Sequence, residues 1–379
     1  MSLSQIKDRM LAAESDNVGD LKTETEELFM QFVGHIVGHI AEIIECVSKE
    51  VHNQLSDKEN ILKEICITAE CFDYEVLQVI SKAMQMLGIS DEQWQLLSYE
   101  ECFAYYAYSQ KKELYSSAVL LLDYQKNGIS ARLMDKGRKN GMEFIMENDD
   151  ILSSQNIVEA YNDSKLEMIQ QEIISWLNNI FRHYNVCSVY LTGKGFDVEA
   201  FPKELINFLC TRRKVFAGQN LYVKGACYCA LAGEFNMSAA VSDKVAGNQK
   251  SDRVFGNAVL ACKNRVTTGI ELNIKDYGKD KRMRLIKPGV NWYMARRSLD
   301  FILDDVDVIK LVMVPCDGSG EYYEEVDISK LPFRQNKQTR INMTLEFTAD
   351  GRCAVNVKDK GFGEFVRSSG IEIFKEIQL

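Results

Sequence analysis

The chain has 379 residues, 46% of them hydrophobic and 26% charged, and a formal net charge of −10 at pH 7. A chain of this length and composition can form two or three soluble domains with separate cores. Because an acidic surface repels phosphate backbones, we expect no nucleic acid partner.

The N-terminal segment "MSLSQIKDRM" is polar and has no signal-peptide core. The eleven cysteines are scattered, and no two of them form a C-x-x-C pair. Such cysteines are typical of reduced core thiols in a cytosolic protein, and their spacing argues against a zinc site or a disulfide framework. We therefore expect a cytoplasmic protein.

Apolar residues recur at helical spacing over residues 24–56, which predicts a long amphipathic helix. Its most apolar window, 28–47, carries Gln, His and Glu side chains, so it is a poor membrane span. His35 and His39 share one face of this helix, a spacing that can hold a metal. No acidic or Cys partner follows at ligand spacing, so we expect helix histidines and no metal site.

The next segments alternate between strand and helix patterns. A strand is predicted over 64–72, and a helix over 73–89 that ends at Gly88. The remaining predictions are a hairpin over 117–135, a strand over 188–192 and helices over 100–110, 157–184, 199–211 and 220–235. This alternation predicts an α/β sheet covered by helices.

The pattern changes after residue 236. Residues 237–252 are small, polar and glycine-bearing, which is typical of a linker. Beyond them, apolar and polar residues alternate between glycine turns, most clearly over 343–357 with Asp350-Gly351 at the turn. We predict an α/β domain over 1–236 and an antiparallel β domain over 253–379.

The segment "SVYLTGKGFDVEAF" (188–201) joins a strand to a helix through Gly-Lys-Gly. It is no P-loop, because it lacks the four-residue spacer and the Ser or Thr after Lys. Its glycines also fit a sharp bend from strand to helix without any ligand.

In this order, the segments resemble the actin-like (ribonuclease H-like) ATPase fold of the seventy-kilodalton heat-shock chaperones. "ICITAECFDYEVLQVISKAMQMLGI" is similar to a strand and helix of that family's first lobe, and "AVLLLDYQKNGISARLMD" to its second phosphate-binding hairpin. "SVYLTGKGFDVEAFPKELINFL" is similar to its adenosine-binding strand, turn and helix, and "NLYVKGACYCALA" to the small-residue helix that follows.

The C-terminal part extends the resemblance. "TRINMTLEFTADGRCAVNVKDKGFGEF" and, more loosely, "RLIKPGVNWYMARRSLDF" are similar to strands of the family's substrate-binding β-sandwich. The resemblance therefore implies a reduced actin-like ATPase-fold domain followed by an antiparallel β-sandwich.

The sequence departs from that family in four places. No Asp-Gly-Thr hairpin precedes "ICITA", and Tyr124, Gln125 and Lys126 follow Asp123 where the family has glycines. The segment before the 157–184 helix is too short for the adenine-clamping lobe, and no helical lid follows the β-sandwich. We expect the first lobe to be either lacking or cut from this chain.

The resemblance implies candidate site residues. Asp123 is the catalytic, metal-positioning candidate, and the nucleotide-binding candidates are Gly193, Lys194, Gly195, Lys126 and Gly128. Asp is equally typical of a strand end at a turn, and loop lysines are usually solvated. Since one isolated carboxylate cannot hold a metal and a triphosphate, we expect no cofactor, with ATP and magnesium as the alternative.

In that family the sandwich binds extended apolar peptides through strand-like hydrogen bonds and a hydrophobic pocket. The corresponding peptide-binding candidates are Trp292, Tyr293, Phe301 and Phe333. Aromatic residues of a small sandwich are more often core residues.

These features predict a divergent, catalytically inactive chaperone-like protein that binds protein or peptide partners through its β-sandwich. The alternative is an ATP-dependent chaperone ATPase whose N-terminal lobe is missing from this chain. A third hypothesis is a protein that retains only the fold and assembles into oligomers through it.

Overall fold

The computed structural model describes a few residues between 27 and 39, all helical as predicted for 24–56. It also describes residues 64–379 except 71, 126–127, 140–141, 153–165, 194–195, 197–202, 233–253, 257, 305, 335–336 and 364–365. The predicted linker 237–252 lies outside the described residues. The chain divides into two compact units, 1–102 with 222–236 and 103–221 with 237–379.

In the first unit, strands β1 (Ile65–Ala69) and β2 (Trp94–Ser98) form a parallel pair joined by helix α3 (Tyr74–Met86). The Asp73 side chain caps α3 by accepting a hydrogen bond from the Val76 N–H at 3.0 Å. The helix ends just before Gly88, whose φ is +73°. The predicted strand, helix and stop signal are therefore confirmed.

Helix α4 (Tyr99–Tyr108) begins with a reciprocal capping box. The Ser98 N–H donates to Glu101 Oε2 at 2.8 Å, and the Glu101 N–H donates to Ser98 Oγ at 3.2 Å. Both side chains are buried. The Ser-x-x-Glu spacing thus allows β2 to lead directly into the helix.

Helix α7 (Leu221–Ala232) packs closely against the backbone of α4 at Gly225. A Cβ on Gly225 would overlap the carbonyl oxygen of Cys102 and lie 2.9 Å from its Cα. The predicted small-residue helix is confirmed, and at this position its small residue lets two backbones approach closely.

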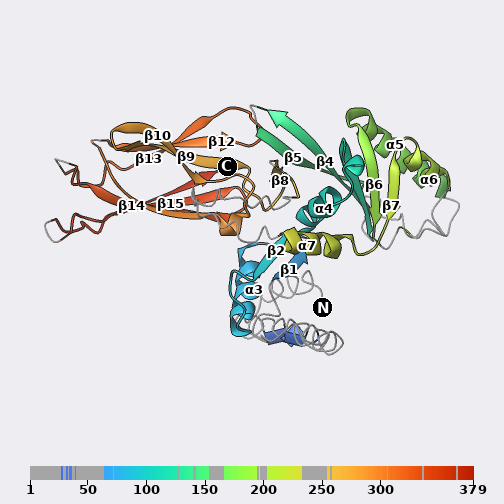
Figure 1. Cartoon of the computed structure of the whole chain (residues 1–379), viewed down its shortest axis with the longest axis horizontal. Coiled ribbons are helices and arrows are strands. Elements are labelled where there is room, and N and C mark those ends of the chain that lie inside the picture. The colour runs from blue at the N-terminus through green and yellow to red at the C-terminus, as the bar shows by residue number, and fades with distance from the viewer. Residues whose placement is uncertain are drawn as a thin grey trace, which may run out of the picture. The chain divides into compact units, whose positions relative to one another are not determined.

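The second unit contains a sheet with the strand order β7-β6-β3-β4-β5-β8 (Figure 1). Strands β3, β4 and β5 are successive antiparallel neighbours, whereas β6 runs parallel to β3, β7 to β6 and β8 to β5. Their bounds are β3 Ala118–Gln125, β4 Gly128–Lys139, β5 Met142–Leu152, β6 Val186–Thr192, β7 Lys214–Ala217 and β8 Val259–Ala261.

Helices α5 (Leu166–His183) and α6 (Lys203–Cys210) lie beside β6 and β7 (Figure 1). Their buried residues join one core with alternate residues of the strands, among them Leu120, Leu122 and Val189. On the opposite face, Phe103 and Tyr106 of α4 pack edge-on against Tyr190. Burial raises the pKa of Tyr190 to about 12. Helices thus lie on both faces of the sheet at β6, in keeping with the predicted α/β arrangement.

The C-terminal residues form two antiparallel sheets, drawn as two layers in Figure 1. One sheet has the order β10-β9-β12-β13 and the other β11-β14-β15-β16. The bounds are β9 Thr268–Asp276, β10 Lys279–Ile286, β11 Arg296–Ile302, β12 Val308–Pro315, β13 Tyr322–Asp327, β14 Arg340–Ala349, β15 Arg352–Asp359 and β16 Glu372–Gln378. The C-terminal part is thus rich in antiparallel strands, as predicted, and the predicted domain bounds stay a prediction.

This β domain is stabilised by the alternation of buried and exposed residues along its strands and by a contact between its two sheets. Every second residue of β14 and β15 is buried, for example Ile341, Met343 and Val355. Lys375 of β16 donates to the Glu324 carboxylate at 2.8 Å and to the Glu325 carbonyl at 2.7 Å, both on β13. The two sheets are therefore joined along this side.

The sequence analysis missed β2 and β5. Strand β2 is a short, fully buried run that periodicity cannot distinguish from part of a helix. The sequence predicts no element at β5, because the acidic residues hide the strand pattern, yet β5 pairs with β4 along its whole length. The dipeptide Asn140-Gly141 is a strong hairpin signal that could have identified it.

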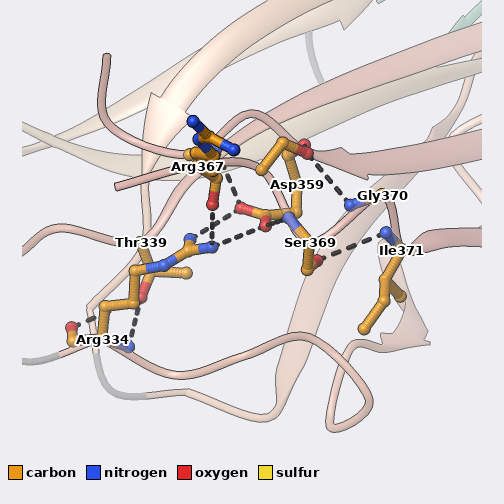
Figure 2. Close-up of polar contacts among 9 residues, drawn as sticks. Arg334, Thr339, Asp359, Arg367, Ser369, Gly370 and Ile371 are labelled. Atoms are coloured by element: carbon orange, nitrogen blue, oxygen red, sulfur yellow. Dashed lines mark hydrogen bonds and ion pairs between the residues drawn. The ribbon is translucent and has the colours of Figure 1, made fainter. Parts of the chain in front are cut away.

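Loops of the β domain meet around Asp359, the last residue of β15 (Figure 2). Arg334 donates to both carboxylate oxygens, at 2.7 and 2.6 Å, and the N–H groups of Gly361 and Ser369 donate at 3.1 and 2.6 Å. Arg334 also donates to the Arg367 carbonyl at 3.3 Å. Because its partners stabilise the ionised form, the pKa of Asp359 lies well below its usual range.

We predict that Asp359→Asn lowers the free energy of unfolding at pH 7 by about 3 kcal/mol, because it leaves the Arg334 guanidinium without its partner charge. The carboxyl pKa is lower in the folded than in the unfolded chain. The contribution of the Asp359 carboxylate to the free energy of unfolding is therefore complete above about pH 3.9, the pKa in the unfolded chain. It is lost as the pH falls through the pKa in the folded chain.

Urea unfolding of the unaltered protein and of Asp359→Asn between pH 7 and 3 measures this difference in the free energy of unfolding. The difference between them should shrink toward pH 3, and a difference that does not change with pH would contradict the assignment. Asp280→Asn, at an exposed carboxylate on β10, is the matched control and should leave stability within about 0.5 kcal/mol.

Candidate functional site

The first candidate site lies at the carboxyl ends of β3 and β6, where Asp123 and Thr192 are opposite each other in the register. Ligands of α/β sheets bind at the carboxyl ends of the strands. The structure brings the predicted residues Asp123 and Gly193 together here, and Gly128 begins the neighbouring β4. The predicted residues Lys126, Lys194 and Gly195 lie outside the described residues.

Neighbouring side chains hold the Asp123 carboxylate. Its side chain is almost completely buried and accepts a hydrogen bond from Gln125 Nε2 at 2.7 Å. Arg132 Nη1 of β4 lies 3.9 Å from its other oxygen and also donates to Ser130 Oγ at 3.3 Å. Gln125 therefore binds the carboxylate that is predicted to position a metal.

Gly193 packs directly on the end of β3. Its φ is +98°, and a Cβ at this position would clash with the Tyr124 carbonyl oxygen and lie 2.7 Å from Asp123 Oδ1. Its own carbonyl accepts hydrogen bonds from Gln219 Nε2 at 3.2 Å and from the Phe196 N–H at 3.3 Å. Close packing between two strand ends is thus sufficient to require this glycine. A role in nucleotide binding stays a prediction.

Among the described residues, no three His, Cys, Asp or Glu side chains are grouped so that they could hold a metal ion. The cysteines described by the structure are free thiols. Where the chain is described, it contains no helix long and apolar enough to cross a membrane.

The aromatic candidates do not share one environment. Trp292 is only 2% exposed, and its Nε1 donates to Asn264 Oδ1 at 3.2 Å. Trp292 is therefore a core residue, and a peptide-binding role for it stays a prediction. Phe301 is half-buried on β11, and Phe333 is 55% exposed. For Tyr293, Phe301 and Phe333 a peptide-binding role stays a prediction.

A second candidate site, which the sequence analysis missed, is a pocket of about 710 Å³ in the β domain. It is formed by the loop after β8, the β12–β13 turn and the β14–β15 turn. Its charged and hydroxyl-bearing lining includes Lys263, Arg265, Thr268, Asp317, Ser319 and Asp350. These residues come from three separate turns and form no motif, so only the fold brings them together.

A comparison with models of protein families assigns the chain to a family. Residues 3–239 match the model described as "Family of unknown function (DUF5716) C-terminal", which covers more than half of the chain. The chain belongs to this family. Residues 265–379 match the model of a "Domain of unknown function (DUF8552)". The comparison with curated proteins gave no match.

Two solved structures show a distant likeness. A chain of the "PilM-PilN type IV pilus biogenesis complex" is 17% identical, with 42% of this chain and 58% of that chain covered and a TM-score of 0.27. The ethanolamine utilization protein EutJ from Carboxydothermus hydrogenoformans is 11% identical, with 51% and 73% covered and a TM-score of 0.28. This chain thus spans under two thirds of the PilM-PilN chain that it matches, and TM-scores this low establish no common fold.

Proposed function

We propose that this protein is a divergent member of the actin-like ATPase fold that binds protein or peptide partners and does not hydrolyse ATP. The resemblance to the heat-shock chaperones rests on the sequence alone. A cytoplasmic location likewise stays a prediction from the cysteine pattern.

Sheet topology supports the actin-like part of the proposal. In the order β5-β4-β3-β6-β7, the strands rank 3-2-1-4-5 along the chain, and only the second runs against the others. This is the arrangement of a ribonuclease H-like sheet, which the actin-like resemblance implies. Helices α5 and α6 follow the third and fourth of these strands.

The binding of Asp123 by its own neighbours is the observation that carries the proposal. Phosphoryl transfer depends on positioning and on charge stabilisation by metal ions and cations around the phosphates. Here the one carboxylate that the resemblance assigns to the metal is buried and hydrogen-bonded to Gln125, with Arg132 beside it. This arrangement favours the non-catalytic interpretation over an ATP-dependent chaperone.

The β domain offers surfaces for a partner. In the described part of the chain, β13 and β16 each pair on one side only. They display exposed aromatic side chains, since Tyr323 is 60% and Phe374 66% exposed. Edge strands accept extended peptides by strand addition, and exposed aromatic residues are typical anchors of protein interfaces.

We predict that calorimetric titration of the protein with ATP and magnesium gives no binding heat, because Gln125 and Arg132 already contact the one carboxylate assigned to the metal. Asp123→Ala should give the same result. Micromolar binding that is abolished by Asp123→Ala would contradict the proposal and favour the ATPase.

We predict that a labelled apolar heptapeptide binds with micromolar affinity in fluorescence anisotropy. Phe374→Ala should weaken this binding about tenfold, the loss expected from one aromatic anchor. Tyr277→Ala is the matched control, because Tyr277 is fully exposed on the β9–β10 turn and should not affect binding. No binding, or equal weakening by both variants, would contradict a peptide site at this edge.

A further inference from the structure

We propose that the pocket in the β domain binds a small zwitterion of the α-amino-acid class, either as a free amino acid or as a short peptide. Its volume of about 710 Å³ lies within the range of about 300–1,000 Å³ that is common for small-molecule sites. This site is separate from the ends of β3 and β6. The proposal is therefore independent of whether the protein binds ATP there.

The wall that carries Lys263 and Arg265 is fixed through the residue between them. Asn264 has a φ of +67°, and its N–H donates to Asp350 Oδ2 at 3.1 Å. Its carbonyl and side-chain oxygens accept from the N–H and Nε1 of the buried Trp292, at 3.1 and 3.2 Å. The loop after β8 is thereby tied to the β14–β15 turn, so the pocket is preformed.

The Arg265 guanidinium is oriented by two contacts. Nη1 donates to the Gly289 carbonyl at 2.6 Å, and Nη2 donates to the Tyr105 hydroxyl of α4 at 3.3 Å. A guanidinium stays protonated at any physiological pH, so this wall carries a fixed positive charge. Lys263 adds a second cation to the same wall.

The carboxylates stand on two other turns. Asp317 Oδ1 accepts the Ser319 N–H at 2.8 Å, which orients this side chain within the β12–β13 turn. Asp350 is oriented by its bond from Asn264. The pocket therefore presents cations from the loop after β8 and anions from two hairpin turns.

This charge distribution selects the class of ligand. The lining carries charges of both signs, so a nucleotide would meet two repelling carboxylates and a polyamine two repelling cations. A zwitterion can direct its carboxylate toward Lys263 and Arg265 and its ammonium group toward Asp317 and Asp350. Thr267, Thr268 and Ser319 add hydroxyl groups to the lining.

The state of the thiols in the pocket indicates a binding site and no covalent chemistry on the cysteines. Cys262 and Cys316 both line it and are buried. Burial raises the pKa of Cys316 to about 11, so its thiol stays protonated at neutral pH. Together with Ala261 and Pro315, the thiols supply apolar surface for a ligand side chain.

The test is a thermal-shift screen of the full chain with each standard L-amino acid and with dipeptides at millimolar concentration, followed by calorimetry of the compounds that stabilise it. At least one compound should raise the melting temperature saturably. Its N-acetyl amide, which lacks both charges, should not. Binding only by a dipeptide identifies a peptide ligand, and binding by a free amino acid identifies a metabolite; both support the proposal.

Variants locate the site. Lys263→Met and Asp317→Asn should each weaken binding about tenfold, the loss of one charge-assisted hydrogen bond. Lys279→Met, at an exposed lysine of β10 outside the pocket, should bind as the unaltered protein does. Comparison of the unliganded melting temperatures shows that the variants are folded. The proposal is overturned if no compound shifts the melting temperature, if the blocked amide binds equally well, or if both pocket variants bind normally.

Discussion

The contact between the end of β3 and the bend after β6 is the constraint on which the rest of the second unit depends. Gly193 adopts a positive φ there, and the Tyr124 carbonyl and the Asp123 carboxylate occupy the space where a side chain would begin. Helix α6 follows along the chain, and its buried residues Leu205 and Leu209 complete the core on that face of the sheet. The same contact places Asp123 where Gln125 and Arg132 surround it.

The sheet also provides the attachment of the β domain. Strand β8 pairs with β5 at one edge of the sheet, and the loop after β8 carries Arg265 to the Tyr105 hydroxyl. Phe255, just before β8, packs against the rings of Tyr105 and Tyr108. The connection is thus made of strand pairing, ring packing and an oriented guanidinium, and one of its residues also lines the β-domain pocket. Ligand binding in that pocket would therefore act on the residues that join the two parts.

Much of this fold could be predicted from the sequence, because the strongest local patterns decide it. The helix ending at Gly88, the β3–β4 hairpin and the Asp350-Gly351 hairpin each have an amphipathic pattern and a turn or stop signal that agree. The site was less predictable. Nothing local shows that Arg132 lies beside Asp123, that Trp292 is buried against Asn264, or that residues from distant turns line one pocket. These features depend on tertiary contacts, which periodicity does not encode.

Gly193 is required because the bend after β6 packs on the end of β3. The free energy of unfolding of Gly193→Ala, measured in urea beside Gly218→Ala, tests this most directly. A Cβ on Gly218 meets no atom within 4 Å, so that variant is the matched control. Gly193→Ala should be destabilised by at least about 2 kcal/mol, from backbone strain and overlap, while the stability of Gly218→Ala should change by less than about 0.5 kcal/mol. Equal stabilities of the two variants would contradict it.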